Sequence, residues 1–255
     1  MIKEILRKNK KLFNILKKIN KYRTIAQVYI YKLFNPIRLS SCDKNSIRCE
    51  YDIRNRNYKY TLLGDNTPIC CLTHLYEITR DITIVLNKED IDYFIMYGTL
   101  LGQVRHNQTF IPWDTDVDIV VMKKDRLKVE ELLSSELSSS YDIVKSEKIM
   151  KINYSKSNQL HADIYFWEEQ DDILIDTLND YWIKNRVQKS DVFPLKSSKL
   201  YNLDVEVPKN KEQVLKDTYG DDCLEKAFKK YASKKEIIRT FNEGKIDKRY
   251  MEVDK

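Results

Sequence analysis

The stretch YGTLLGQVRHNQTFIPWDTDVDIVVM, residues 97–122, decides the fold because it joins a glycine turn and a short helix to an acidic strand. It holds two of the five glycines in the 255-residue chain. Its carboxylates alternate as Asp114, Asp116 and Asp118, and side chains two apart in a strand share a face. Three like charges on one face repel unless a cation lies among them, and hard divalent ions such as Mg²⁺ take carboxylate oxygens. The stretch therefore predicts a divalent metal site.

The segments on either side alternate between helix and strand patterns. Thr67-Pro68 predicts a helix start, and apolar residues at helical spacing continue it to about Asn87. A strand over 92–96, a short helix over 99–106 and a further helix over 126–138 are expected. Strand-like runs follow at 141–144, 149–154, 161–167 and 172–176, with a hairpin over 194–208 and a charged helical tail from Lys211.

The composition, 42% hydrophobic and 33% charged, predicts a soluble globular chain of one large domain, with or without an appendage. The net charge of +6 suits an anionic partner, although ordinary solvated lysines explain it equally well. No run approaches the roughly 20 apolar residues of a membrane span, and no signal-peptide pattern is seen. We therefore expect a cytoplasmic location with reduced thiols.

Residues 1–34 follow the pattern of a basic amphipathic helix, with Lys and Arg between apolar positions at near-helical spacing. One interpretation is a helix lying on an anionic membrane surface, which would make the protein peripheral at the membrane. The alternative, which we favour slightly, is a helix packed on its own domain or on a protein partner. Asn35-Pro36 ends the pattern, so we divide the chain into this helix and a catalytic domain over 35–255.

The glycine turn and the aspartates together indicate phosphate chemistry. A strand that ends in Gly98-Thr99 before a helix places backbone N–H groups and a hydroxyl where an anion can bind. The next strand presents paired carboxylates, so a metal could bridge them to that anion, as in nucleotidyl and phosphoryl transfer. A lone D-x-D is a weak signal of a metal site. The combination within one window is much more specific, because it joins GTLLG, RH, IPWD and DVDIVV.

This window resembles the signature of the LicD family, the bacterial phosphocholine transferases and their relatives fukutin and fukutin-related protein. HADIYFW (161–167) resembles the family's second acidic strand, and VEVPKNKEQVLKDTYGD (205–221) resembles its closing segment. The resemblance implies an α+β, nucleotidyltransferase-like fold, with a mixed β-sheet flanked by helices. The family more often has Ala where this chain has Gln103, and Gly where it has Asn107. Neither difference touches a carboxylate.

Carried over residue by residue, the resemblance assigns the metal contacts. Asp116 and Asp118 would hold Mg²⁺ or Mn²⁺, with Asp114 beside them. Asp163 would complete the metal site or act as general base on the acceptor hydroxyl. The alternative for Asp163 is a solvated strand residue.

The same resemblance assigns the donor contacts. Arg105 would bind the donor phosphates by charge-assisted hydrogen bonds, together with Gly98 and Thr99, whereas a structural ion pair is its alternative role. His106 is either a ligand contact or a polar cap on the short helix. Trp113 is expected in the core more than as a stacking platform for cytosine.

Four of the five cysteines precede the acidic strand: Cys42, Cys49, Cys70 and Cys71. Four thiolates suffice for a tetrahedral structural Zn²⁺ site, but this spacing is not the common ribbon pattern, so the residues alone leave zinc open. The fukutin-related branch of the family carries a four-cysteine zinc loop of this layout, and that resemblance implies a zinc-stapled loop over 42–71. Cys223 stands apart and is expected to be an ordinary thiol.

The resemblance implies an enzyme that moves a phospho-alcohol from a CDP-linked donor to a glycan hydroxyl or a polyol-phosphate acceptor and releases CMP. It favours ribitol phosphate, with phosphocholine and glycerol phosphate as alternatives, and no nucleic-acid partner. Two other functions stay open: a nucleotidyltransferase that moves the nucleotide itself, and a non-catalytic glycan-binding relative.

Overall fold

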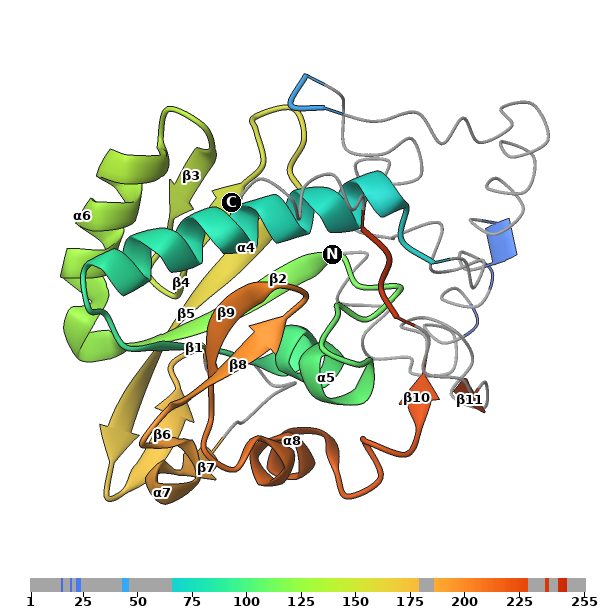
Figure 1. Cartoon of the computed structure of the whole chain (residues 1–255), viewed down its shortest axis with the longest axis vertical. Helices are drawn as coiled ribbons and strands as arrows, with labels where there is room; N and C mark the ends of the chain where they lie inside the picture. Colours follow the sequence, from blue (N-terminus) through green and yellow to red (C-terminus); the bar gives the residue numbers. More distant parts are fainter. Residues whose placement is uncertain are drawn as a thin grey trace.

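The computed structural model describes residues 66–178 and 186–228, with short pieces at 15, 19, 22–23, 43–45, 237–238 and 243–246 (Figure 1). Almost all of the helix predicted over 1–34 lies outside the described residues, as do Cys42 and Cys49. Within the described part of the chain, no helix combines the length and the apolar character needed to cross a bilayer.

A seven-stranded mixed sheet forms the centre of the domain (Figure 1). Its main path runs β1-β2-β5-β4-β3, with β6 beside β5 and β7 beside β6. The β2–β5 pair is parallel and the other pairs are antiparallel. The strands are β1 (Tyr93–Ile95), β2 (Asp116–Met122), β3 (Asp142–Lys145), β4 (Ile149–Asn153), β5 (His161–Gln170), β6 (Ile173–Asp176) and β7 (Arg186–Gln188). The α+β class and the mixed sheet predicted from the sequence are confirmed.

The remaining elements pack around this sheet. Helix α4 packs on α6 and on β2 and β5, whereas α5 packs against β2 and α8. Strand β9 lies against β1. The bounds are α4 (Ile69–Lys88), α5 (Tyr97–Arg105), η1 (Lys123–Asp125), α6 (Arg126–Leu137), α7 (Lys189–Val192), β8 (Lys196–Leu200), β9 (Leu203–Val207), α8 (Lys211–Tyr219), β10 (Ala227–Phe228) and β11 (Ile237–Ile238).

Residues 69–88 form helix α4 because their apolar side chains recur at helical spacing and form one buried stripe that packs on the sheet. The residue preceding the helix is Pro68, and no side chain caps it. The expected cap, Thr67, instead donates its hydroxyl to the carbonyl of Asp114 at 2.5 Å. That hydroxyl therefore anchors the acidic loop rather than the helix.

Two further expectations need correction. Asp114 lies before β2, which begins at Asp116, so the three aspartates do not share one strand face. Helix α5 begins at Tyr97 rather than Thr99, and Tyr97 itself has a left-handed φ of 50°. The chain turns so sharply after β1 that Gly98 lies within the first turn of the helix.

The two positions where the chain differs from the residues expected of the family, Gln103 in α5 and Asn107 in the loop after it, have clear structural settings. Asn107 has φ 54°, a left-handed conformation that glycine adopts without strain and asparagine tolerates. The amide nitrogen of Gln103 donates to Ser198 Oγ at 2.9 Å and to Lys199 O at 3.0 Å. Its amide oxygen accepts from Lys211 Nζ at 3.0 Å, so Gln103 ties α5 to β8 and α8.

Gly102→Ala should destabilise the fold by about 1–3 kcal/mol. Alanine would normally favour a helix by about 1 kcal/mol. A Cβ here would lie 2.6 Å from Thr109 O and 2.8 Å from Ile111 N, and backbone atoms cannot move aside as a side chain can. Urea unfolding measures the change. The control is Ser135→Ala on the exposed side of α6, which should stay within about 0.5 kcal/mol of the parent. An unchanged urea midpoint for Gly102→Ala would contradict this packing.

Candidate active site

Asp118 is fixed by the first turn of α5. Its carboxylate oxygen Oδ2 accepts from the backbone N–H of Gly98 at 3.2 Å. Its own backbone N–H donates to Thr99 Oγ1 at 2.9 Å. The Gly98-Thr99 pair therefore orients Asp118 at a helix N-terminus, where the helix dipole favours negative charge. The predicted contact of this pair with a donor phosphate stays a prediction.

Asp114 approaches the same helix turn from the loop before β2. A Cβ on Gly98 would lie 2.9 Å from Asp114 Oδ2, so glycine at this position allows the carboxylate to pack onto the turn. The loop is held by Asp114 N–H, which donates to Ile111 O at 2.9 Å, and by the Thr67 hydroxyl. Asp114 thus lies beside the acidic strand, as predicted, but reaches it from outside the strand.

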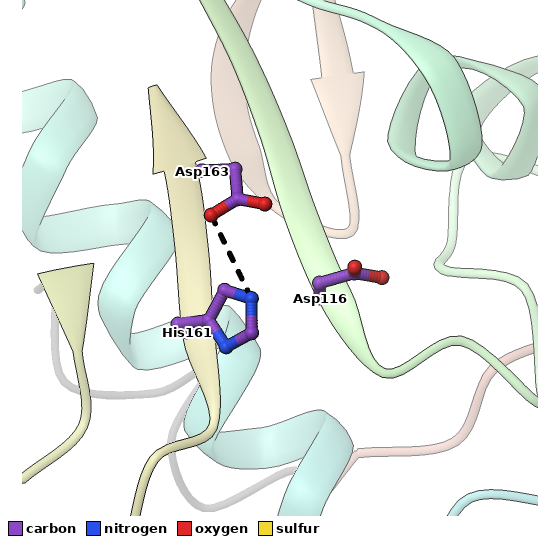
Figure 2. A group of neighbouring side chains, drawn as sticks. All are labelled: Asp116, His161 and Asp163. Atoms are coloured by element: carbon purple, nitrogen blue, oxygen red, sulfur yellow. Dashed lines mark ion pairs between the residues drawn. The ribbon is translucent and has the colours of Figure 1, made fainter. Parts of the chain in front are cut away.

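The parallel register of β2 and β5 completes the acidic group. Asp116 pairs with His161 and Asp118 pairs with Asp163 across the two strands. Ligand atoms of Asp116, His161 and Asp163 lie within 4.8 Å of one another, a group that could hold a metal ion (Figure 2). The prediction that Asp163 joins the aspartates of β2 agrees with this geometry.

His161 is a member of this group that the sequence analysis did not assign. Its Nδ1 lies 2.9 Å from the carbonyl of Gln159. A carbonyl only accepts, so Nδ1 carries a proton, and Nε2 faces Lys151 Nζ at 3.0 Å and Asp163 Oδ1 at 3.6 Å. A ring N–H that donates to a backbone carbonyl is common in metal-binding histidines. The H-x-D spacing of His161 and Asp163 on one strand face was the available signal.

The charges of the site are unbalanced. Burial, reinforced by the carboxylates of Asp116, Asp114 and Asp163, raises the pKa of Asp118 well above its ordinary value. Carboxylates with an imidazole beside them form a donor set that fits a divalent cation, and such an ion would relieve the repulsion. The described residues therefore include a group that could hold a metal ion, to which Asp116 belongs and Asp118 does not, so the assignment of Asp118 as a ligand stays a prediction.

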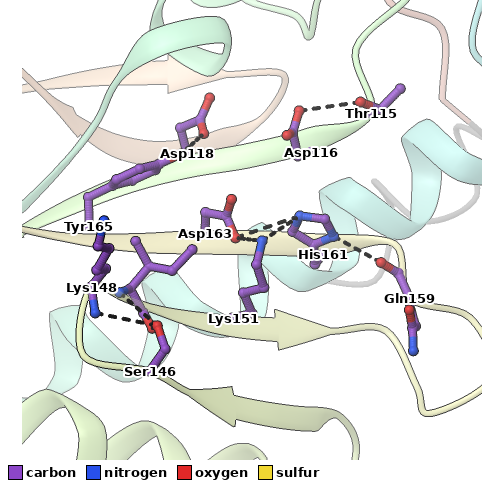
Figure 3. Close-up of polar contacts among 11 residues, drawn as sticks. Thr115, Asp116, Asp118, Ser146, Lys148, Lys151, Gln159, His161, Asp163 and Tyr165 are labelled. Atoms are coloured by element: carbon purple, nitrogen blue, oxygen red, sulfur yellow. Dashed lines mark hydrogen bonds and ion pairs between the residues drawn. The ribbon is translucent and has the colours of Figure 1, made fainter. Parts of the chain in front are cut away.

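Tyrosines surround the acidic group, and the sequence analysis missed them. The Tyr165 hydroxyl donates to Asp118 Oδ1 at 3.1 Å (Figure 3). Burial, and then the carboxylates of Asp118, Asp163 and Asp116, raise the pKa of Tyr165 far above its ordinary value. Tyr219 also lies near these carboxylates: burial, and then Asp118, Asp114 and Asp116, raise its pKa, although 42% of the residue is exposed. These hydroxyls stay protonated and can donate hydrogen bonds.

Arg105 connects α5 to the segment after α8. Its Nη1 donates to Cys223 O at 2.8 Å and to Lys226 O at 2.9 Å, and its Nε donates to His106 Nε2 at 3.1 Å. Burial lowers the pKa of Arg105 to about 10. In this structure Arg105 thus positions the segment after α8, and its contact with donor phosphates stays a prediction.

The neighbouring aromatic residues belong to the core. His106 is fully buried and packs edge-to-face on Trp113, with ring centroids 5.5 Å apart. Trp113 is 7% exposed, which agrees with its expected place in the core.

Cys70 and Cys71 lie at the start of α4, and Cys71 is buried. Cys42 and Cys49 are outside the described residues, so the zinc site stays a prediction.

Comparison with known proteins gives the same family as the sequence motifs. Residues 90–210 match the family model described as LicD/FKTN/FKRP, nucleotidyltransferase domain. The chain is 31% identical over 152 residues to the mouse protein named ribitol 5-phosphate transferase FKRP, across 57% of this chain and 30% of that protein. It is 33% identical over 134 residues to an uncharacterized Rickettsia typhi protein, across 52% of this chain and 41% of that one.

The chain therefore spans about a third of the first relative's length. Among solved structures, the lincomycin-bound lincosamide antibiotic adenylyltransferase LnuA is similar, with a TM-score of 0.38 and 15% identity over 56% of this chain and 82% of that one. The resemblance to the LicD family inferred from the sequence is confirmed.

Asp118→Asn should raise the melting temperature of the metal-free protein by about 2–4 °C at pH 7, about 1 kcal/mol for a chain of this size. Because the folded-state pKa of Asp118 is raised, ionisation of Asp118 opposes folding. That penalty is absent below the ordinary pKa of an aspartate and grows as the pH rises. The difference in melting temperature between Asp118→Asn and the parent should therefore shrink from pH 8 to pH 5. Calorimetry at several pH values measures it.

The control for this comparison is Glu131→Gln, an equivalent change on the exposed side of α6, which should leave the melting temperature unchanged at each pH. Added Mg²⁺ should stabilise the parent protein and not Asp118→Asn. A variant that melts below the parent at pH 8 without metal would show that Asp118 is not under electrostatic strain.

Proposed function

We propose that the chain, whose residues 90–210 form a LicD-family nucleotidyltransferase domain, transfers a phospho-alcohol from a CDP-linked donor to a glycan hydroxyl or a polyol-phosphate acceptor. The observation that carries the proposal is the group formed by Asp116, His161 and Asp163 beside the buried Asp118. Asp118 accepts from the backbone N–H of Gly98 at the N-terminal end of α5, so phosphate oxygens and a cation would meet beside this group.

Asp116 and Asp118 would hold Mg²⁺ or Mn²⁺, with Asp163 and His161 beside them on the adjacent strand β5. The ion would neutralise the charge of the donor diphosphate. Asp114 lies outside this ligand set and would shape the turn at Gly98 through its close packing there. Thr99 would keep Asp118 in place through the hydrogen bond to its backbone N–H.

In the reaction, the acceptor oxygen would attack the distal phosphorus and form a new P–O bond. The bond between that phosphorus and the bridging oxygen would break, and CMP would leave with the electron pair. The proton of the acceptor hydroxyl would pass to a carboxylate, for which Asp163 is the candidate. The Tyr165 hydroxyl, which donates to Asp118 Oδ1, lies close enough to the carboxylates to orient groups bound there.

Ribitol phosphate is the favoured group, because the mouse relative is named a ribitol 5-phosphate transferase. Phosphocholine and glycerol phosphate are the alternatives. Transfer of the nucleotide itself is a second candidate function, since the matching family model describes a nucleotidyltransferase domain. Product analysis separates the two: phospho-alcohol transfer releases CMP, and nucleotide transfer leaves a nucleotide on the acceptor.

The enzyme incubated with Mg²⁺, candidate glycan acceptors and CDP-ribitol, CDP-choline or CDP-glycerol should release CMP fastest from CDP-ribitol. Asp116→Asn should lower the rate by at least about 10²-fold, beyond the 10–100-fold typical of a second-shell loss. Glu131→Gln should match the parent. No CMP from any donor, or full activity in Asp116→Asn, would reject the proposal.

For residues 1–34 we propose a basic amphipathic helix that packs on its own domain or on a protein partner, with peripheral attachment of a cytoplasmic protein to membranes as the alternative. We also propose a structural Zn²⁺ on Cys42, Cys49, Cys70 and Cys71. The basic amphipathic pattern and the cysteine layout support these two proposals. The membrane alternative predicts that removal of residues 1–34 abolishes flotation with liposomes that contain anionic lipid. Equal flotation of the two forms would discard the membrane contact.

A further inference from the structure

Lys151 reaches into the acidic group from the neighbouring strand. It lies on β4 and pairs with Asp163 of β5 in the antiparallel register, so the two side chains share a face of the sheet. Its Nζ lies 2.5 Å from Asp163 Oδ1 and 3.0 Å from His161 Nε2 (Figure 3). An ammonium group thus bridges two of the three side chains that could hold a metal.

The spacing of these two groups suits an ammonium better than a small divalent ion. His161 Nε2 and Asp163 Oδ1 are 3.6 Å apart. Adjacent ligands on an octahedral Mg²⁺, each at about 2.0–2.1 Å, lie roughly 3 Å from each other. Lys151 donates to both groups across the wider gap, and its side chain is 35% exposed, so its stem reaches the site from the solvent side.

Asp116 and Asp118 lie on the other side of the group, on β2. Lys151 bonds to Asp163 and His161 of β5, and the hydrogen bonds described for Asp118 come from Gly98 and Tyr165. Enzymes with two metal ions hold them about 3.5–4 Å apart and share carboxylates between them. The printed donors to the two carboxylates of β2 are neutral groups, from Thr115, Gly98 and Tyr165, whereas Asp163 of β5 already faces the Lys151 ammonium.

We propose that Lys151 is a positioning residue that takes the place of a second metal ion, so that the domain binds one divalent ion at Asp116 and Asp118. Its ammonium neutralises Asp163 and keeps His161 Nε2 from a metal. The inference rests on the metal-dependent reaction proposed above, but metal stoichiometry tests it independently of transfer.

The test is a Mn²⁺ titration of the metal-free full-length protein, in which electron paramagnetic resonance measures unbound Mn²⁺. The parent should bind one Mn²⁺ per chain. Lys151→Met removes the ammonium and should bind two, whereas Lys151→Arg keeps a cation and should bind one. A variant with both Asp116→Asn and Asp118→Asn gives the background from other sites. Two ions in the parent, or a single ion in Lys151→Met, would overturn the proposal.

Thermal unfolding gives a second readout and guards against a variant that folds poorly. Without metal, Lys151→Met and Lys151→Gln should melt below the parent, because Asp163 is buried and loses its partner. Saturating Mn²⁺ should raise their melting temperatures more than that of the parent, since two ions stabilise them by linkage. An equal Mn²⁺-induced rise in parent and variants would overturn the proposal. If the parent and the variants bind the expected numbers of Mn²⁺ but no CMP is released, the transfer reaction is rejected and the role of Lys151 stands.

Discussion

The parallel pairing of β2 with β5 is the constraint on which the site depends. It aligns Asp116 with His161 and Asp118 with Asp163, so ligands from two distant parts of the chain lie at one level of the sheet. Parallel neighbours cannot be joined by a tight turn. The chain between them, residues 123–160, therefore returns through η1, α6, β3 and β4, and the last of these strands brings Lys151 to the same site.

The site contains interactions that oppose folding, and the stability of the rest of the domain offsets them. Several carboxylates lie together, and the raised pKa of Asp118 reflects burial and their mutual repulsion. Tyr97 starts α5 with a left-handed φ, which costs on the order of 1 kcal/mol for a residue with a Cβ. Its ring packs edge-to-face on Tyr165, with centroids 4.9 Å apart. Strain and like charge of this kind are common at functional sites, because a relaxed arrangement would not bind a cation.

The connections around α5 make the closing segment of the domain part of the site. Gln103 ties the helix to β8 and α8, and Arg105 binds the carbonyls of Cys223 and Lys226. Tyr219, at the end of α8, is thereby held near the carboxylates. Gln103 thus makes tertiary contacts, and Arg105 links the signature window to the residues that follow α8.

The sequence by itself determined what local periodicity encodes: the helix after Pro68, the strands that carry Asp116, Asp118 and Asp163, and the family signature across them. It did so because alternation within a strand and apolar spacing within a helix are set by neighbouring residues. Only the tertiary structure decided that Asp114 reaches the site from outside β2, that Arg105 contacts backbone carbonyls, and that His161, Tyr165 and Lys151 surround the acidic group. Those contacts depend on the strand register and on the crossover connection. Both are set by interactions between residues far apart in the chain, so local sequence patterns do not reveal them.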